Sequence, residues 1–392
     1  MKTVVLFGNF QLPEGSALAT RVVALAKLIG ACGYDVVMCG IDYNDCMMTS
    51  GTYEDIPYEL IPFGLSNYKL LKRKKRLCIL KERIDAWFRS FSKDHEIYAV
   101  LYCGGGQGLV SFVIDYCKLH NYKLIYNFVE WFGISRFNGL LGPFQYLNYL
   151  YDFHCQYPRI KNVIGISSLL TDYCKKKGCH TIRIPTITDV SMYQTDTTAR
   201  NMDSTVIAYA GNMGKKDAVI NVVKAIALLQ EDLRKRLKYV LYGVTQKELI
   251  KCCGCNVEVK KCIGREIVCK GVVPYREVRK ELLKCDFTIL LRKSTRRSNA
   301  GFPTKVGESM AAGVPVIANL TSDIGLYLHD GVEGLVCSDE KPETCMQVIA
   351  KALKMTTDEK REMRLNARKQ AEKSFDCFAY VEEMSLFLKE II

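Results

Sequence analysis

Hydrophobic and polar positions follow two alternating patterns along most of the chain. Short apolar runs rich in β-branched residues predict buried strands, and longer stretches with an apolar residue every three or four positions predict helices. This alternation is typical of parallel sheets covered by helices. In the first half, we expect a helix over 17–32. Strands are expected there at 3–7, 35–39, 99–102, 124–128, 163–166 and 181–184.

The alternation stops once, near the middle of the chain. Pro185–Asp189 and the polar stretch 194–203 carry neither pattern, and a strand pattern starts again at Thr205, so we expect a linker between two domains. The elements expected after it are strands at 205–210, 239–244, 287–291 and 314–318 and helices at 217–229, 275–284 and 304–312. The sequence therefore predicts an α/β protein with two doubly wound, Rossmann-like domains.

Domain boundaries follow from this pattern. The expected parts are a first domain over 1–187, a linker over 188–202, a second domain over 203–373 and a C-terminal helix over 374–392 that packs back on the first domain. Ligands of open parallel sheets bind beyond the carboxyl ends of the strands, so two such domains facing across a cleft would share one site with two subsites. Functional residues are therefore expected in loops that follow strands.

Composition narrows the class of protein. With 48% apolar and 25% charged residues in 392, the chain is neither disordered nor collagen-like. Most of the 18 cysteines stand singly in apolar runs, which indicates reduced thiols in a cytosolic protein. The cluster Cys252, Cys253, Cys255, Cys262 and Cys269 does not have zinc-site spacing, so we expect no metal site. Neither a signal peptide nor a membrane-spanning segment is expected, because the longest uncharged stretch, 97–114, is interrupted by glycines.

Charge points to an anionic partner, since the net formal charge is +13. Segment 69–93 contributes ten basic and two acidic residues, or +8, and its apolar residues recur at helical spacing. The pattern predicts a helix whose apolar stripe packs on its own sheet, or faces lipid, and whose basic rim rests on an anionic membrane. Nucleic acid is not expected as a partner, because no recognition module accompanies the basic residues.

A second segment, 139–151, is uncharged and rich in tyrosine. The favoured interpretation is a helix of the hydrophobic core. The alternative is an interface with a membrane or with a lipid-linked acceptor.

The loop after the first strand ends in Glu14, Gly15 and Ser16 and leads into a helix. Small residues let a ligand approach the backbone, and a helix start offers unpaired N–H groups. The loop lacks the G-x-G-x-x-G pattern of dinucleotide sites. An ordinary strand-to-helix turn is the alternative interpretation.

The loop after the first strand of the second domain runs from Gly211 to Asp217. Its glycines free the backbone and Lys215 and Lys216 supply positive charge at a helix start, so the loop could hold a pyrophosphate. A solvated lysine pair is the alternative.

A third loop begins at Arg292 and leads into a helix with Pro303 near its first position. Glu308 falls one turn into that helix. A carboxylate placed there can accept both hydroxyls of a ribose, while exposed N–H groups at the helix start meet phosphate.

The run Gly-Phe-Pro-Thr-Lys-x-x-Glu-x-x-Ala-x-Gly-x-Pro-Val-Ile over 301–317, with 271–278 and 286–291 before it, resembles the donor-binding half of GT-B glycosyltransferases of family 4. The resemblance covers nearly the whole chain, because 163–185 is similar to the end of that family's first domain and 209–217 to its phosphate loop. Among its members, the chain looks most like those that build bacterial capsule, exopolysaccharide or O-antigen.

The resemblance implies a role for individual positions. Glu308 matches the second glutamate of a paired motif that holds the nucleotide ribose, and Lys216 matches the lysine that meets the donor diphosphate. Gly301 and Phe302 match the backbone that lines the donor sugar, and Gly15 matches the loop that faces the acceptor. The other candidate donor contacts are Gly211, Asn212, Lys215, Arg292, Pro303, Thr304 and Lys305.

Two positions depart from the family pattern. Ala300 stands where the first glutamate of the pair is expected, and Asn212 stands where many members have arginine. We expect Arg292, Arg296 or Arg297 to replace the lost charge.

The resemblance implies a retaining glycosyltransferase that needs no cofactor or essential metal. The expected partners are a UDP- or GDP-sugar and a glycan or polyprenyl-diphosphate-linked acceptor, with the protein cytoplasmic or peripheral on the inner face of the membrane. Glu130, after a strand of the first domain, is a candidate general base or acceptor clamp, or else a surface carboxylate or helix cap. The alternative functions are a nucleotide-sugar 2-epimerase of the same fold and a non-catalytic partner subunit.

Overall fold

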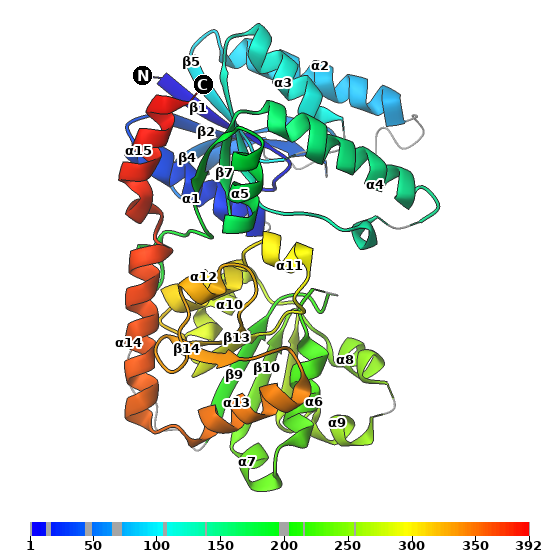
Figure 1. Ribbon diagram of the computed structural model, residues 1–392, viewed down its shortest axis with the longest axis vertical. Coiled ribbons are helices and arrows are strands. Elements are labelled where there is room, and N and C mark those ends of the chain that lie inside the picture. The colour runs from blue at the N-terminus through cyan, green and yellow to red at the C-terminus, as the bar shows by residue number, and fades with distance from the viewer. Residues whose placement is uncertain are drawn as a thin grey trace. The chain divides into compact units, whose positions relative to one another are not determined.

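The computed structural model describes residues 2–12, 17–43, 49–64, 73–104, 108–137, 139–195, 204–214, 216–254 and 256–391. They form two compact units (Figure 1). The first unit comprises Met1–Thr188 together with Cys377–Ile392, and the second comprises Asp189–Asp376. Part of the expected linker, 196–202, lies outside the described residues.

The first unit is built on an eight-stranded sheet in the order β3-β4-β2-β1-β5-β6-β7-β8 among its described residues. Only the β3–β4 pair is antiparallel among these strands. The strands are β1 (Lys2–Gly8), β2 (Asp35–Asp42), β3 (Ser50–Tyr53), β4 (Ile56–Pro62), β5 (Glu96–Tyr102), β6 (Lys123–Phe128), β7 (Asn162–Gly165) and β8 (His180–Arg183). The helices are α1 (Ala17–Ala31), α2 (Arg73–Phe91), α3 (Leu109–Leu119), α4 (Gly142–Tyr151), α5 (Ser168–Lys176) and α15 (Val381–Glu390).

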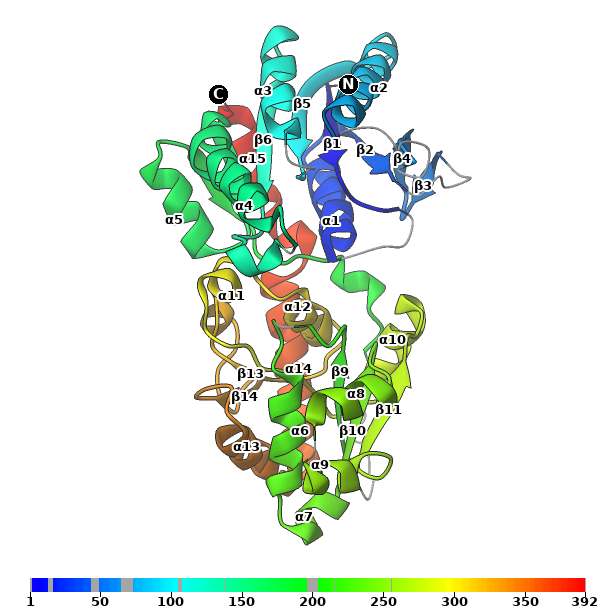
Figure 2. The same ribbon diagram turned by 90° about the vertical axis from the view of Figure 1, so that its right-hand side faces the viewer.

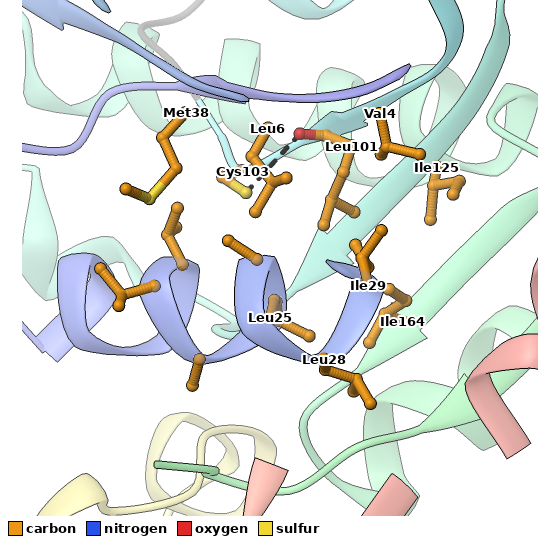
Figure 3. Packing of buried hydrophobic residues seen from close by; sticks show 14 of the residues in the cluster. Val4, Leu6, Leu25, Leu28, Ile29, Met38, Leu101, Cys103, Ile125 and Ile164 are labelled. Atoms are coloured by element: carbon orange, nitrogen blue, oxygen red, sulfur yellow. Dashed lines mark hydrogen bonds between the residues drawn. The ribbon is translucent and has the colours of Figure 1, made fainter. Parts of the chain in front are cut away.

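The core of the first unit lies between this sheet and α1. Leu25, Leu28 and Ile29 of α1 are fully buried against apolar side chains of the central strands, including Val4 and Leu101 (Figure 3). Their spacing of three and four puts them on one face of the helix, as its sequence predicts. Central strands such as β1 and β5 are largely buried on both faces, which explains their nearly continuous apolar runs.

The second unit has a six-stranded parallel sheet in the order β11-β10-β9-β12-β13-β14. The strands are β9 (Thr205–Ala210), β10 (Leu237–Tyr242), β11 (Ile267–Gly271), β12 (Phe287–Leu290), β13 (Val316–Asn319) and β14 (Gly334–Cys337). The helices are α6 (Val219–Leu228), α7 (Glu231–Lys235), α8 (Gln246–Cys253), α9 (Val257–Cys262), α10 (Tyr275–Leu282), α11 (Arg296–Ala300), α12 (Thr304–Ala311), α13 (Pro342–Lys354) and α14 (Thr357–Ser374). Counted within the unit, this is the 3-2-1-4-5-6 order of a Rossmann fold, so the predicted α/β class is confirmed.

The end of the chain is not one helix over 374–392. Helix α14 ends at Ser374, a short 3-10 turn follows at Cys377–Tyr380, and α15 then packs in the first unit. The Tyr98 hydroxyl donates a hydrogen bond to the carbonyl oxygen of Leu388 at 2.9 Å, and several apolar side chains of α15 join the core of that unit.

The favoured interpretation of 139–151 as a core helix is wrong. Helix α4 forms there, but of its residues only Gly142 and Tyr149 are buried. Helix α2 does turn its apolar side inward, because Leu80, Ile84 and Phe88 are buried. No helix in the described part of the chain is both long and apolar enough to cross a bilayer.

Candidate nucleotide-binding site

The order of strands in the second unit reverses between β9 and β12. In a doubly wound sheet, this switch point opens a crevice at the carboxyl ends of the two strands, where ligands bind. The loop after β9 contains Asp217, and the chain after β12 continues into Arg292. These two residues form an antiparallel β-bridge, so the fold brings both loops together at the switch point.

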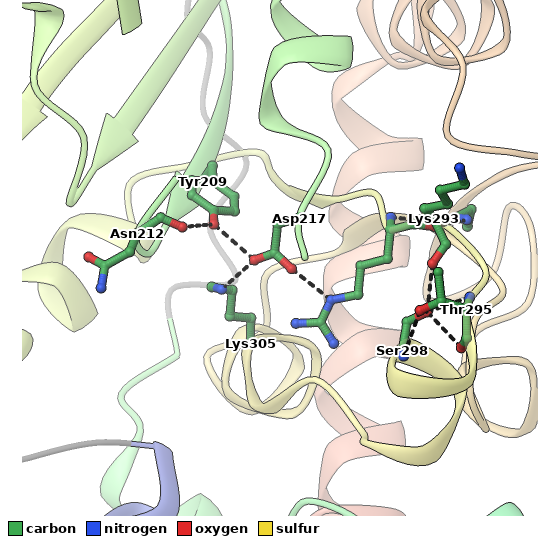
Figure 4. Close-up of polar contacts among 9 residues, drawn as sticks. Tyr209, Asn212, Asp217, Lys293, Thr295, Ser298 and Lys305 are labelled. Carbon is green, nitrogen blue, oxygen red and sulfur yellow. Dashed lines mark hydrogen bonds and ion pairs between the residues drawn. The ribbon is translucent and has the colours of Figure 1, made fainter. Parts of the chain in front are cut away.

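Asp217 is the centre of a polar cluster at this point (Figure 4). Its Oδ1 accepts a hydrogen bond from Arg292 Nε at 2.7 Å, and its Oδ2 accepts one from Lys305 Nζ at 2.8 Å. The Tyr209 hydroxyl lies 2.9 Å from Oδ2 and 3.0 Å from the carbonyl oxygen of Asn212. We call Tyr209, Asp217, Arg292 and Lys305 the Asp217 cluster.

The electrostatics of the cluster favour an anionic ligand. Burial by itself raises the pKa of Asp217, but the charges of Arg292 and Lys305 outweigh it and hold the pKa at about 2. Asp217 is therefore ionised at neutral pH, and two cations around one carboxylate leave a net charge of about +1. Burial raises the pKa of Tyr209, so its hydroxyl stays protonated and can donate.

Arg292 keeps part of its hydrogen-bonding capacity. Its side chain is 6% exposed, and its Nη1 is buried without a hydrogen-bond partner among the described residues. A buried guanidinium nitrogen without a partner is costly unless a ligand or water meets it. Together with the net positive charge, this atom indicates a site for a phosphate-like group.

Gly211 is needed for the position of Lys305. A Cβ atom added at Gly211 would lie 2.6 Å from Lys305 Cε and 2.8 Å from its Nζ. The glycine therefore lets the lysine lie directly against the backbone of the loop after β9. This is the role of a glycine where a side chain and a backbone approach closely.

The loop after β12 is held by its own hydrogen bonds. The side-chain amide of Asn319 bonds both the N–H and the carbonyl oxygen of Arg292, at 2.8 and 2.7 Å. Thr295 and Ser298 form a capping box at the start of α11, and Ser298 Oγ donates to the carbonyl oxygen of Lys293 at 2.6 Å. The guanidinium of Arg292 is thus presented by a backbone that needs no ligand to order it.

The helix after this loop, α12, begins at Thr304 behind Pro303, and Lys305 is its second residue. Its N-terminus adds partial positive charge to the cluster. Glu308 lies one turn further and is half-buried, while Ala300 and Gly301 are buried. The Phe302 ring packs against Tyr327 and Phe375, at centroid distances of 5.6 and 5.8 Å, so its side chain belongs to the core.

Some of the other predicted site residues are described by the structure, and some lie outside its described residues. Asn212 is exposed and Lys216 half-buried in the loop after β9, and Glu130 is half-buried just after β6 in the first unit. Glu14, Gly15, Ser16 and Lys215 lie outside the described residues. Arg296 and Arg297 are the first residues of α11.

Sequence reasoning treated Asp217 as the first residue of a helix and missed its role. Helix α6 begins only at Val219, and Asp217 lies in the loop before it. Tyr209 and Asn319 were not singled out either. The available signal was an acidic residue directly after two lysines, but its partners Arg292 and Lys305 are 75 and 88 positions away and cannot be read from local spacing. Among the residues that the structure describes, no three His, Cys, Asp or Glu side chains gather in a way that could hold a metal ion.

A protein-family model matches part of the chain. Residues 194–373 match the family model described as Glycosyl transferases group 1. The matched residues cover most of the second unit, Asp189–Asp376. All four residues of the Asp217 cluster lie within the matched residues. No curated protein sequence matches the chain.

Solved structures extend the likeness to the whole chain. Sucrose-phosphate synthase from Thermosynechococcus elongatus has a TM-score of 0.73 at 14% identity, covering 100% of this chain and 99% of its own. Anabaena HepE in complex with UDP and glucose has a TM-score of 0.70 at 14% identity, covering 99% and 100%. Trehalose-6-phosphate from E. coli bound with UDP-2-fluoro glucose has a TM-score of 0.67 at 10% identity, covering 100% of both chains. The predicted GT-B fold is confirmed.

Proposed function

We propose that this protein is a retaining glycosyltransferase of the family 4 type that transfers a sugar from a UDP- or GDP-sugar. The acceptor is a glycan, or a glycan carried on polyprenyl diphosphate, in the synthesis of capsule, exopolysaccharide or O-antigen. The observation that carries the proposal is the Asp217 cluster, with its net positive charge and unpartnered Arg292 Nη1, at the switch point of the unit that matches the Glycosyl transferases group 1 model. Two structures of similar fold hold UDP or a UDP-sugar derivative, which supports a nucleotide-sugar donor.

The cluster suits the departure of a nucleoside diphosphate. Negative charge grows on the diphosphate as its bond to the sugar breaks, and cations fixed beforehand stabilise that charge. Arg292 and Lys305 are the fixed cations, and Lys216 with the start of α12 adds positive charge. Asp217 is a positioning residue, because it orients both cations without cancelling their combined charge. Glu308 holds the ribose of the nucleotide in this proposal.

The acceptor side belongs to the first unit. Glu130 is the proposed general base or acceptor clamp, and Glu14, Gly15 and Ser16 are the other proposed acceptor-binding residues. Helix α2 places the protein on the anionic inner surface of a membrane, because its apolar side is buried while Lys74 and Lys75 are exposed. We expect neither a cofactor nor an essential metal to take part.

The donor proposal is tested by thermal unfolding with UDP- and GDP-sugars. The true donor raises the melting temperature of the wild type, and Lys305→Met weakens its binding by about tenfold or more, because a hydrogen bond to a charged group is lost. Lys351→Met is the matched control, since Lys351 forms an exposed ion pair with Asp330 at 2.8 Å, away from the cluster. A wild type that no nucleotide sugar stabilises would contradict the proposal.

The reaction is tested separately, by product analysis with and without a glycan acceptor. Transfer to the acceptor supports the transferase. Conversion of the donor alone into its 2-epimer would instead show the epimerase of the same fold. Donor binding with neither product, under conditions where acceptors of several classes are supplied, would favour the non-catalytic partner subunit.

A further inference from the structure

Helix α4 and the residues before it present an exposed apolar stripe. Leu140, Phe144, Leu147 and Tyr151 are 94%, 67%, 61% and 57% exposed. The spacing of Phe144, Leu147 and Tyr151 places these three on one face of α4, and Leu140 lies just before the helix. We call these four residues the α4 stripe. The sequence contains no charged residue from 137 to 151.

The α4 stripe is not what holds the helix to its unit. Tyr149, on another side of α4, is buried, and its ring lies 5.6 Å from the rings of Phe132, Phe137 and Phe153. Its hydroxyl also accepts a hydrogen bond from the N–H of Phe132 at 2.9 Å. The stripe is therefore not needed to pack α4 against its unit. An exposed apolar patch of this kind indicates an interaction surface.

Basic residues accompany the stripe. The N-terminal ends of α2 and α4 both extend toward the right-hand side of the first unit in Figure 1, the side that faces the viewer in Figure 2. Lys74 and Lys75 are exposed at that end of α2, and Arg136 is exposed just before α4. Asp152, directly after the stripe, is half-buried. Exposed apolar side chains and basic side chains on the same side of the unit match an anionic lipid surface.

Helix α2 cannot supply the apolar part of such an anchor. Its own apolar residues Leu80, Ile84 and Phe88 are buried inside the unit. The two helices therefore supply different parts of the membrane-binding surface: α2 supplies positive charge, and α4 supplies exposed apolar side chains. A symmetric dimer through α4 is less suited, because it would bring the same basic residues of both copies together.

We propose that the α4 stripe inserts into the boundary between headgroups and acyl chains of a bilayer that contains anionic lipids, while the basic residues of α2 rest on the headgroups. Tyr151 suits this depth, since tyrosine is enriched at membrane interfaces. This inference rests on the proposed function in one respect: the proposed function supplies the membrane as the partner. Membrane insertion would also serve the proposed reaction. Helix α4 follows β6 and Glu130 in the chain, so insertion brings this part of the first unit to the surface where a lipid-linked acceptor resides.

The test is co-sedimentation of the full chain with phosphatidylcholine vesicles, with and without phosphatidylglycerol. Leu147→Ser is compared with Leu386→Ser on α15, because these leucines are 61% and 58% exposed. We expect Leu147→Ser to weaken binding to anionic vesicles by about tenfold and Phe144→Ser/Leu147→Ser by more, with Leu386→Ser equal to the wild type. Lys74→Glu/Lys75→Glu should weaken binding most at low salt.

Equal vesicle binding by the wild type and the Phe144→Ser/Leu147→Ser variant would overturn the inference. If that variant instead loses self-association in sedimentation equilibrium and keeps vesicle binding, the stripe contacts a second copy of the chain and the inference is also overturned. Donor-induced thermal stabilisation is measured on the same variants. It should be unchanged in the α4 variants, so a failure of donor binding with intact vesicle binding overturns the transferase proposal alone.

Discussion

Two buried arginines, one in each unit, differ in their hydrogen-bond partners. This difference distinguishes a structural role from a role in ligand binding. Arg21 of the first unit donates from Nε to Asn127 Oδ1 at 3.0 Å and from its other nitrogens to the carbonyl oxygens of Ile184 and Pro185. It has no carboxylate among these partners, and burial lowers its pKa to about 10. Arg292 has a carboxylate partner and still keeps Nη1 unpartnered among the described residues. Arg21 therefore has a structural role, whereas Arg292 has a hydrogen-bond donor available for a ligand.

Asp217→Asn tests the electrostatics of the cluster. The folded pKa of Asp217, about 2, lies below the ordinary value of 3.8, so its stabilisation is complete above pH 4 and is lost as the pH falls through about 2. We expect the wild type to lose about 2 kcal/mol over that range relative to Asp217→Asn, measured by urea unfolding. As a control, Asp115→Asn breaks an exposed ion pair with Arg159 and should cost less than about 1 kcal/mol at neutral pH. A constant difference between wild type and Asp217→Asn across pH 2 to 4 would contradict the assignment.

Gly211→Ala tests the approach of Lys305 to the backbone. The added Cβ would displace the lysine, so donor affinity measured by calorimetry should fall by about tenfold. Gly214→Ala in the same loop is the matched control, because a Cβ there meets nothing within 4 Å. Equal donor affinity in the two variants would show that the position of Lys305 does not matter.

At the scale of elements, the last described helix packs in the unit that the first half of the chain forms. Helix α15 is the last helix, but Met384, Phe387 and Leu388 belong to the core of the first unit. The Phe387 ring stacks on His180 of β8 at 4.8 Å. The core of the first unit therefore includes side chains of α15.

Leu388→Ala should lower the free energy of unfolding by about 3 kcal/mol, because it leaves a cavity at a fully buried position of α15. Leu386→Ala on the same helix is the control. It removes the same atoms from a side chain that is 58% exposed and should change stability by less than about 0.5 kcal/mol. Urea unfolding followed by circular dichroism measures both. Similar losses for the two variants would show that α15 is not packed as described.

At the scale of the whole molecule, positive charge has two proposed roles. In the second unit, the buried Arg292 and the half-buried Lys305 are proposed to meet a diphosphate, and in the first unit, the exposed lysines of α2 are proposed to meet a membrane surface. Buried charges are screened by salt much less than exposed ones. Raising the ionic strength should therefore weaken vesicle binding more steeply than donor binding.

Removal of divalent metal tests the proposed chemistry of the molecule. Protein cations, rather than a metal ion, are proposed to stabilise the departing diphosphate. We therefore expect the initial rate of sugar transfer to be the same in EDTA and in added magnesium. A rate that falls in EDTA and returns with magnesium would contradict the prediction.

Most strands could be predicted from the sequence because strands buried on both faces have nearly continuous apolar runs. The strands that escaped prediction lack that signal. Strands β3 and β4 form the one antiparallel pair of the described sheet, and β3 is largely exposed. Strands β11 and β14 lie at the two edges of the second sheet. Strand β11 is only partly buried, and β14 has only four residues, so neither has a long apolar run.

The candidate site was predictable only in part. Gly211, Arg292 and Lys305 could be singled out because they lie in glycine-containing or basic loops after strands. Their arrangement around Asp217 could not, since it depends on the pairing of β9 with β12.

Local patterning alone thus determined the class of fold, most of the strands and helices, and which loops follow the predicted strands. Periodicity is a property of neighbouring residues, and each segment carries it by itself. Only the tertiary structure decided that Asp217 joins Arg292 and Lys305, and that the apolar stripe of α4 faces outward. Each of these depends on which distant element covers a given face, and that is settled by long-range packing.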